Sequence, residues 1–110
     1  MDASFKFGHE RLDCYRLARE VADWAARQGF PTERRHLRDQ LVRAADSVVL
    51  NIAEGSGKEP GAARRNYYSI ALASAAEACA VLDLVRLAEG AARQAQLRRV
   101  GAMLTKMTRG

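Results

Sequence analysis

The residues with the most chemical potential form one polar line along the stretch from Leu37 to Gly55. Glutamine, arginine, serine, asparagine and glutamate recur there at steps of three and four residues, which places them on one side of a helix. Together with one carboxylate from the next predicted helix, this polar ribbon comprises Gln40, Arg43, Ser47, Asn51, Glu54 and Glu77. Two functions are open for it: a hydrogen-bonded network that fixes helix register, or a groove that receives a ligand or a nucleic-acid backbone through Arg43. The first requires Arg43 to be buried and paired with Glu77 or with an adjacent subunit, and the second requires it to be exposed.

The sequence offers little support for metal binding or catalysis. Paired metals in helical bundles use two Glu-x-x-His pairs and two further glutamates. Glu33 and His36 have that spacing, but His9 has no glutamate three residues before it. The sequence also lacks the GxSxG and HExxH motifs of hydrolases. We therefore expect no metal, no cofactor and no enzymatic activity.

The positive charge of the chain is concentrated in its second half. The formal net charge is +5, and no acidic residue occurs from Ala91 onward. A helical wheel puts four basic residues on one side of the last helix, and two arginines follow the glycine-rich loop before the third helix. The predicted nucleic-acid-binding residues are Arg64, Arg65, Arg93, Arg98, Arg99, Lys106 and Arg109. Because aromatic residues for base stacking are scarce nearby, we expect contacts to phosphate and shape rather than to sequence. The alternative is a solvated face with no binding role.

Apolar residues at helical spacing predict the elements that position these groups. Helices are expected at about residues 9–28, 33–55, 62–88 and 92–107, after a flexible tail at 1–8. Short connections indicate an all-α, antiparallel, up-down-up-down four-helix bundle that forms a single domain over residues 9–110. The core seam of the third helix is predicted to contain Tyr67, Ile70, Ala71, Ser74, Ala78, Val81, Leu82 and Val85.

The predicted helices carry more apolar surface than one bundle can bury. The second helix is apolar on two sides, and the third has a second apolar line beside its core seam. We therefore expect self-association with helix-on-helix contacts between copies. The predicted oligomer seam consists of Val42, Val49, Ala73, Ala76, Ala80, Leu84 and Leu87.

Composition also bears on compartment. The start of the chain lacks the long apolar centre of a signal peptide, and no apolar run reaches the roughly 18 residues needed to cross a bilayer. Cys14 and Cys79 lie near apolar helix faces rather than in a CxxC pair, so free buried thiols are expected. These features predict a cytoplasmic protein that does not bind membranes.

The residues around the polar ribbon resemble those of a known family. SVVLNIAEG, preceded by QLVRAA, is similar to the central signature of the bacterial 23S rRNA intervening-sequence protein family, whose members are four-helix bundles. The amino-terminal pattern of that family is matched by Phe7, Leu12, Tyr15 and Ala18. Its third-helix pattern is matched by Ile70, Ala71, Ala73, Ser74 and Glu77. The chain departs from the family's usual Trp, Pro-Ala, Phe and Leu at Tyr15, Val49 and Leu50, Arg64, and Tyr68.

The resemblance implies a ring. Family members and their relatives, including the accessory variability protein of diversity-generating retroelements, form barrel-shaped homopentamers with a basic exterior or pore. That relative associates with nucleic acid and with a reverse transcriptase, whereas the family itself has no settled biochemical role. We therefore interpret the chain as a non-enzymatic, oligomeric module that binds RNA or a ribonucleoprotein electrostatically. The alternative is a protein scaffold or adaptor with no nucleic-acid role.

Overall fold

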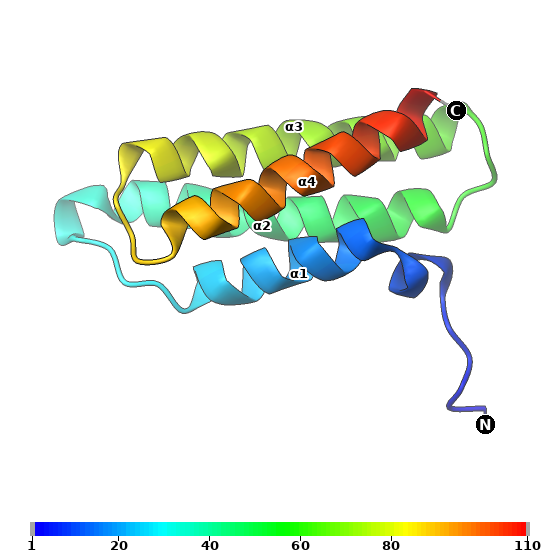
Figure 1. Cartoon of the computed structure of the whole chain (residues 1–110), viewed down its shortest axis with the longest axis horizontal. Helices are drawn as coiled ribbons and strands as arrows, with labels where there is room; N and C mark the ends of the chain where they lie inside the picture. Colours follow the sequence, from blue (N-terminus) through cyan, green and yellow to red (C-terminus); the bar gives the residue numbers. More distant parts are fainter. Residues whose placement is uncertain (1, 110) are drawn as a thin grey trace.

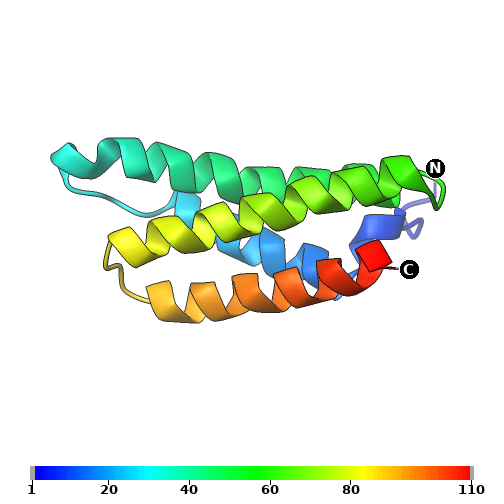
Figure 2. The same ribbon diagram turned by 90° about the horizontal axis from the view of Figure 1, so that it is seen from above.

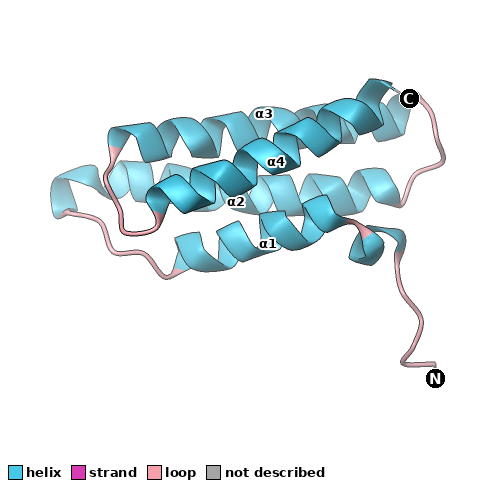
Figure 3. Cartoon of the chain, in the orientation of Figure 1, coloured by secondary structure: helices cyan, strands magenta, loops and turns pink. Residues whose placement is uncertain are grey.

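The structure, a computed structural model, describes residues 2–109, which form four α-helices and no strand. The helices are α1 (Asp13–Ala26), α2 (Arg35–Ser56), α3 (Ala62–Leu84) and α4 (Gly90–Arg109), and short 3-10 turns at Gly8–Arg11 and Thr32–Arg34 precede α1 and α2. Each helix runs antiparallel to the one before it (Figure 1). Colouring by secondary structure leaves only short loops between the helices (Figure 3). The predicted all-α, up-down-up-down bundle is therefore confirmed for the described part of the chain.

The four helices pack as a closed cycle around one core. α2 packs against α1 and α3, and α4 packs against α3 and α1, whereas α1 and α3 are not adjacent helices. α1 and α3 thus occupy opposite corners of the bundle, as the view from above shows (Figure 2). The largest fully buried side chains come from α1, α2 and α4, and they are Cys14, Val21, Leu41, Val48, Ile52, Val100 and Leu104.

The core contribution of α3 differs from the predicted seam. Tyr68 is buried, Tyr67 is half-buried, and Ile70 is 40% exposed. The ring of Tyr68 fits against Gly55 of α2, where an added Cβ would lie only 2.7 Å from Tyr68 Cε1. Its hydroxyl is 2.9 Å from Ser56 Oγ, which satisfies the polar end of the buried ring. The placement of Tyr67 and Ile70 in the core was therefore wrong, because Gly55 makes room for Tyr68 instead.

An arginine closes the C-terminal end of α1. The side chain of Arg38, on α2, donates to the carbonyl oxygens of Gln28 and Ala26 at 3.1 Å each. The last carbonyls of a helix have no partner within the helix, so a guanidinium group can satisfy them. This contact ties the first helix-to-helix connection to α2.

Two helix ends lie more than two residues from their predicted positions. α1 begins at Asp13 rather than at about residue 9, because Leu12 is extended (φ −91°, ψ 129°) and separates the 3-10 turn from the helix. α3 ends at Leu84 rather than at about residue 88, because Val85 is extended (φ −130°, ψ 123°) and its side chain is buried. The backbone thus leaves the helix at Val85 while its side chain remains in the apolar core.

α3 is long and apolar enough, by length and composition alone, to cross a membrane. An 18-residue window within it has a mean hydropathy of 1.2, and 39% of that window is buried. The sequence nevertheless has no uninterrupted apolar run of that length, because every 18-residue window of α3 contains Glu77. Core helices of soluble proteins pass the same test. Here α3 packs along α2 and α4, and many of its apolar residues are alanines, which allow helices to approach closely.

Candidate nucleic-acid interface

The outer side of α4 carries an open cluster of positive charge. The opposite side of the helix packs into the core through three buried residues, Leu97, Val100 and Leu104. The exposed cations are Arg98, Arg99, Lys106 and Arg109, which we call the basic face. Within residues 2–109, none of these four side chains forms an ion pair. The basic face therefore presents uncompensated charge to solvent, as a phosphate-binding surface requires.

Arg65 lies near one end of the basic face. A Cβ built at Gly101 of α4 would be 3.5 Å from Leu72 Cδ1 of α3, so these two residues face each other. Because α3 and α4 are antiparallel, Arg65, seven residues before Leu72, lies at about the level of Thr108. Figure 1 shows the start of α3 and the end of α4 at the same end of the bundle. The exposed Arg65 is thus placed to extend the basic face at that end.

Arg64, the residue before it, has a different environment. Its guanidinium group donates to the carbonyl oxygens of Gly55 at 3.1 Å and Ser56 at 3.4 Å, and also to that of Lys58. These carbonyls lie at the end of α2 and just beyond it, where no helical donor is available. Arg64 therefore closes the α2–α3 connection, as Arg38 closes the connection before it.

Arg93 is also occupied within the chain. Its guanidinium carbon lies 5.5 Å from the ring centroid of buried Trp24, in a cation–π arrangement. Its nitrogens donate to Gln96 Oε1 at 2.9 Å and to Glu89 Oε1 at 3.1 Å. Only 18% of its side chain is exposed, and its Nε is buried without a hydrogen-bond partner. Arg93 ties α4 to α1, so it does not join the basic face.

The middle of the polar ribbon is a structural contact. The hydroxyl oxygens of Ser47 on α2 and Ser74 on α3 are 2.8 Å apart. The amide of Asn51 donates to the carbonyl oxygen of Ser47 at 2.9 Å and to its hydroxyl oxygen at 3.1 Å. These half-buried groups fix the antiparallel register of α2 against α3.

The rest of the ribbon is open. Gln40, Arg43, Glu54 and Glu77 are exposed, and Arg43 has no ion pair within residues 2–109. The register set by the two serines places Arg43 and Glu77 at one level of the bundle, yet they do not form the ion pair expected within the chain. Arg43 is thus exposed, as a binding role requires. The pairing of Arg43 with a carboxylate of an adjacent subunit stays a prediction.

The predicted oligomer seam divides in the same way. Val42, Val49 and Leu87 are half-buried, and the last two pack against the chain's own core. The α3 members of the seam are exposed, with Leu84 at 60%. Three of them, together with Ile70 and Glu77, form a line at steps of three and four residues. We call this line the α3 stripe: Ile70, Ala73, Glu77, Ala80 and Leu84. This spacing is that of a helix seam that packs on another helix.

Sequence reasoning missed two large members of the exposed apolar surface. Ile70 was assigned to the core, although its spacing from Leu84 along the α3 stripe is visible in the sequence. Leu50, on α2, is 63% exposed and was assigned to no surface. Ala76, the remaining predicted seam residue, is exposed beside the stripe towards α4.

Comparison with known protein families gives a match. The family model described as 23S rRNA-intervening sequence protein matches residues 10–109. The chain belongs to this family. The match spans all four α-helices, so it includes the α3 stripe, the polar ribbon and the basic face. A search of curated proteins gives no match.

The described residues of the chain contain no group of three histidine, cysteine, aspartate or glutamate side chains that could hold a metal ion. Its two cysteines are free. Cys14 is buried beside Met107, and burial raises the pKa of its thiol. Cys79 is half-buried between α3 and α4, so only the first cysteine has the fully buried position expected of both.

Proposed function

We propose that this protein is a non-enzymatic, cytoplasmic module that self-associates and binds the phosphate backbone of RNA, alone or within a ribonucleoprotein. The observation that carries the proposal is the basic face. Four exposed cations occupy the outer side of α4, and none has an ion-pair partner among residues 2–109. A cation without a carboxylate partner can neutralise a phosphate and release its counterions.

Self-association would strengthen this attraction. Four charges on one chain give weak binding, but a symmetric assembly repeats the basic face and raises the local potential. The α3 stripe supports such an assembly because Ile70 and Leu84 are too exposed to stabilise the lone bundle. Glu77 at the centre of the stripe would fix the register between copies, with Arg43 of another copy as its partner. The homopentamer implied by the family resemblance is the assembly we propose.

A binding titration tests the nucleic-acid part of the proposal. Fluorescence anisotropy with a labelled single-stranded RNA is measured at 50 to 200 mM salt. If all four cations of one protomer contact phosphates, the slope of log K against log salt is about −2.8. The variant Arg98→Gln/Arg99→Gln/Lys106→Gln/Arg109→Gln should lose most of this affinity and slope.

A matched control separates the basic face from net charge. Changing Arg19, Arg27, Arg34 and Arg35 to Gln also removes four exposed cations, but from the other half of the chain. Both variants lower the formal net charge by the same amount, so the control should keep most of the affinity. Equal losses in the two variants, or wild-type affinity that ignores salt, would count against the basic face.

A second candidate function is a protein scaffold or adaptor with no nucleic-acid role. The exposed apolar side chains of Leu50, Ile70 and Leu84 favour it, because such groups suit protein partners rather than phosphates. A pull-down from the source cell after nuclease treatment distinguishes the two. A partner that stays bound to the wild type and to the basic-face variant supports the adaptor, whereas loss of all partners with nuclease supports RNA binding.

A further inference from the structure

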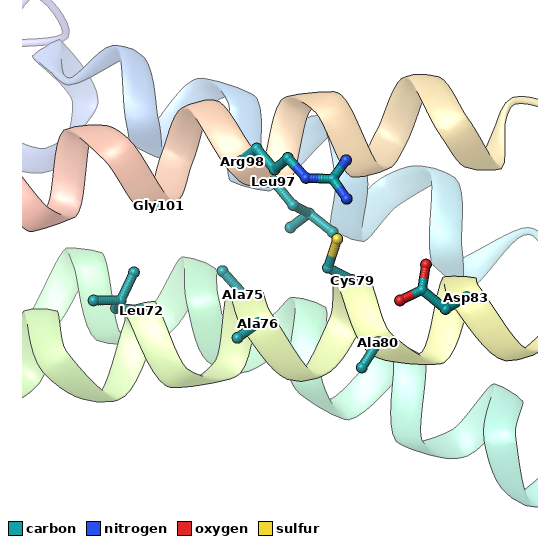
Figure 4. Close-up of a pocket in the computed structure, with 9 residues that line it drawn as sticks. All are labelled: Leu72, Ala75, Ala76, Cys79, Ala80, Asp83, Leu97, Arg98 and Gly101. Carbon is teal, nitrogen blue, oxygen red and sulfur yellow. The ribbon is translucent and has the colours of Figure 1, made fainter.

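A shallow apolar groove runs between α3 and α4. Its volume is about 360 Å³, and its lining is mostly small or apolar: Leu72, Ala75, Ala76, Cys79, Ala80, Leu97 and Gly101. Two charged residues, Asp83 on α3 and Arg98 on α4, stand at its sides (Figure 4). The groove is open along one side, so it suits a segment of protein chain rather than an enclosed small molecule.

The chain itself carries an exposed apolar segment, in which only Phe7 has a ring neighbour outside the segment, His9 at 6.0 Å between centroids, among residues 2–109. The N-terminal arm, Asp2–Phe7, precedes the first 3-10 turn and leads away from the bundle (Figure 1). Phe5 is 64% exposed and Phe7 is 61% exposed. Their ring centroids are 5.1 Å apart in an edge-to-face arrangement, so both rings lie on one side of the arm. Paired aromatic rings left in water are typical of a contact surface rather than of a solvated tail.

We propose that Phe5 and Phe7 of one copy bind in the α3–α4 groove of a second copy. The small side chains at Ala76, Ala80 and Gly101 leave space for flat rings. The volume of the groove falls at the lower end of the roughly 300–1,000 Å³ that is usual for sites of drug-sized groups.

The charges of the two surfaces are complementary as well. The arm carries one acidic and one basic side chain, Asp2 and Lys6, on either side of Phe5. The groove carries Arg98 and Asp83, the latter accepting a hydrogen bond from Gln94 at 2.8 Å. An arm lying along it can place each of its charges near one of opposite sign, which leaves Arg99, Lys106 and Arg109 of the basic face for phosphate.

The topology directs the arm to another copy rather than to its own groove. The 3-10 turn that anchors the arm packs on α1 and α2, whereas the groove lies between α3 and α4. The arm starts beside the end of α2, where a Cβ built at Gly8 would lie 3.4 Å from the carbonyl oxygen of Ser56, and its 3-10 turn packs on neither α3 nor α4. Its six residues reach at most about 20 Å when fully extended. The inference rests on the proposed self-association, because it adds a contact between copies beside the α3 stripe.

A disulfide cross-link tests this contact in the full chain. The variant Phe7→Cys keeps Phe5 as an anchor and places a thiol where it should meet the native Cys79 of the groove. Cys14 is buried and does not compete. Mild oxidation with copper–phenanthroline should give covalently linked dimers in at least tenfold higher yield than the control Asp23→Cys, which puts an exposed thiol on α1. The link should disappear in Phe7→Cys/Cys79→Ser.

Each other result overturns the inference. A disulfide within a single chain would show that the arm occupies its own groove, and a yield no higher than that of Asp23→Cys would show that it occupies neither. Light scattering on the wild type separates the two levels of the proposal. An assembly that does not cross-link refutes the arm contact alone, whereas a wild-type monomer refutes self-association and the arm contact together.

Discussion

Two neighbouring arginines at the start of α3 should respond to the same substitution in opposite ways. Arg64→Ala removes the hydrogen bonds from the guanidinium group to the carbonyls of Gly55, Ser56 and Lys58. Arg65→Ala removes an exposed cation. Arginine and alanine both favour helices, so helix propensity contributes little to the difference. Arg64→Ala should therefore destabilise the fold, and Arg65→Ala should weaken RNA binding.

The size of the first effect can be worked from the contacts. A hydrogen bond from a charged group contributes about 1.5–3 kcal/mol when it is well shielded. Arg64 is only half-buried, and water can replace part of each bond, so we expect a total loss of about 2 kcal/mol. With an unfolding entropy of about 2.1 cal/mol/K per residue, this corresponds to a fall in Tm of roughly 9 °C for a chain of this length.

Thermal unfolding followed by circular dichroism measures the fall in Tm. All variants are compared at one protomer concentration, because association shifts Tm. RNA affinity is then compared below the lowest Tm. Arg64→Ala should bind RNA within about twofold of the wild type, and Arg65→Ala should keep the wild-type Tm. The reasoning is refuted if Arg64→Ala melts like the wild type while losing RNA affinity, since Arg64 would then be a binding residue.

Three further experiments test the packing at Gly55, the burial of Cys14 and the role of Leu84 in self-association. Gly55→Ala should lower the free energy of unfolding in urea by about 1–2 kcal/mol, because the added Cβ would press on the ring of Tyr68. The higher helix propensity of alanine offsets only part of this cost. Unchanged stability would contradict the close contact. In a Cys79→Ser background, Cys14 should resist alkylation at pH 8 until urea unfolds the chain, because burial raises the pKa of its thiol and blocks access; rapid labelling of the folded protein would disprove this. Leu84→Glu should leave the helical circular dichroism spectrum intact and weaken self-association, as sedimentation velocity can show, and an unaltered assembly would remove Leu84 from the interface.

The helices and their order were predictable because they depend on local information. Apolar spacing within each helix and the glycine and proline residues between helices are both read directly from the sequence. The exposed apolar side of α3 was predictable for the same reason, since Ala73, Ala80 and Leu84 lie away from the core seam. The end of α3 was not, because the sequence has no helix breaker before Gly90, and the turn depends on burying Val85.

The core position of Tyr68 depends on a residue of another helix. The absence of a side chain at Gly55 creates the space that the ring fills, whereas the periodicity within α3 fits Tyr67 and Tyr68 equally well. Ile70, although it is more apolar than tyrosine, lies on the exposed side of α3.

Charge is the least predictable part of the candidate interface. Arg93 and Trp24 lie far apart in the sequence, so their contact depends on how α4 packs on α1. Arg64 and Arg65 are adjacent, yet one closes a helix and the other faces solvent. Counting basic residues on a helical wheel identifies a face, but only the neighbouring helices decide which cations are free.

The molar mass in solution tests the proposed self-association most directly, since the α3 stripe is exposed within residues 2–109. Light scattering coupled to gel filtration, at micromolar protomer concentration and physiological salt, should give a multiple of the 12.1 kDa chain mass. Five copies correspond to about 60 kDa. A single species of 12.1 kDa would show that Ile70 and Leu84 remain in water, and it would contradict both the assembly and the repeated basic face.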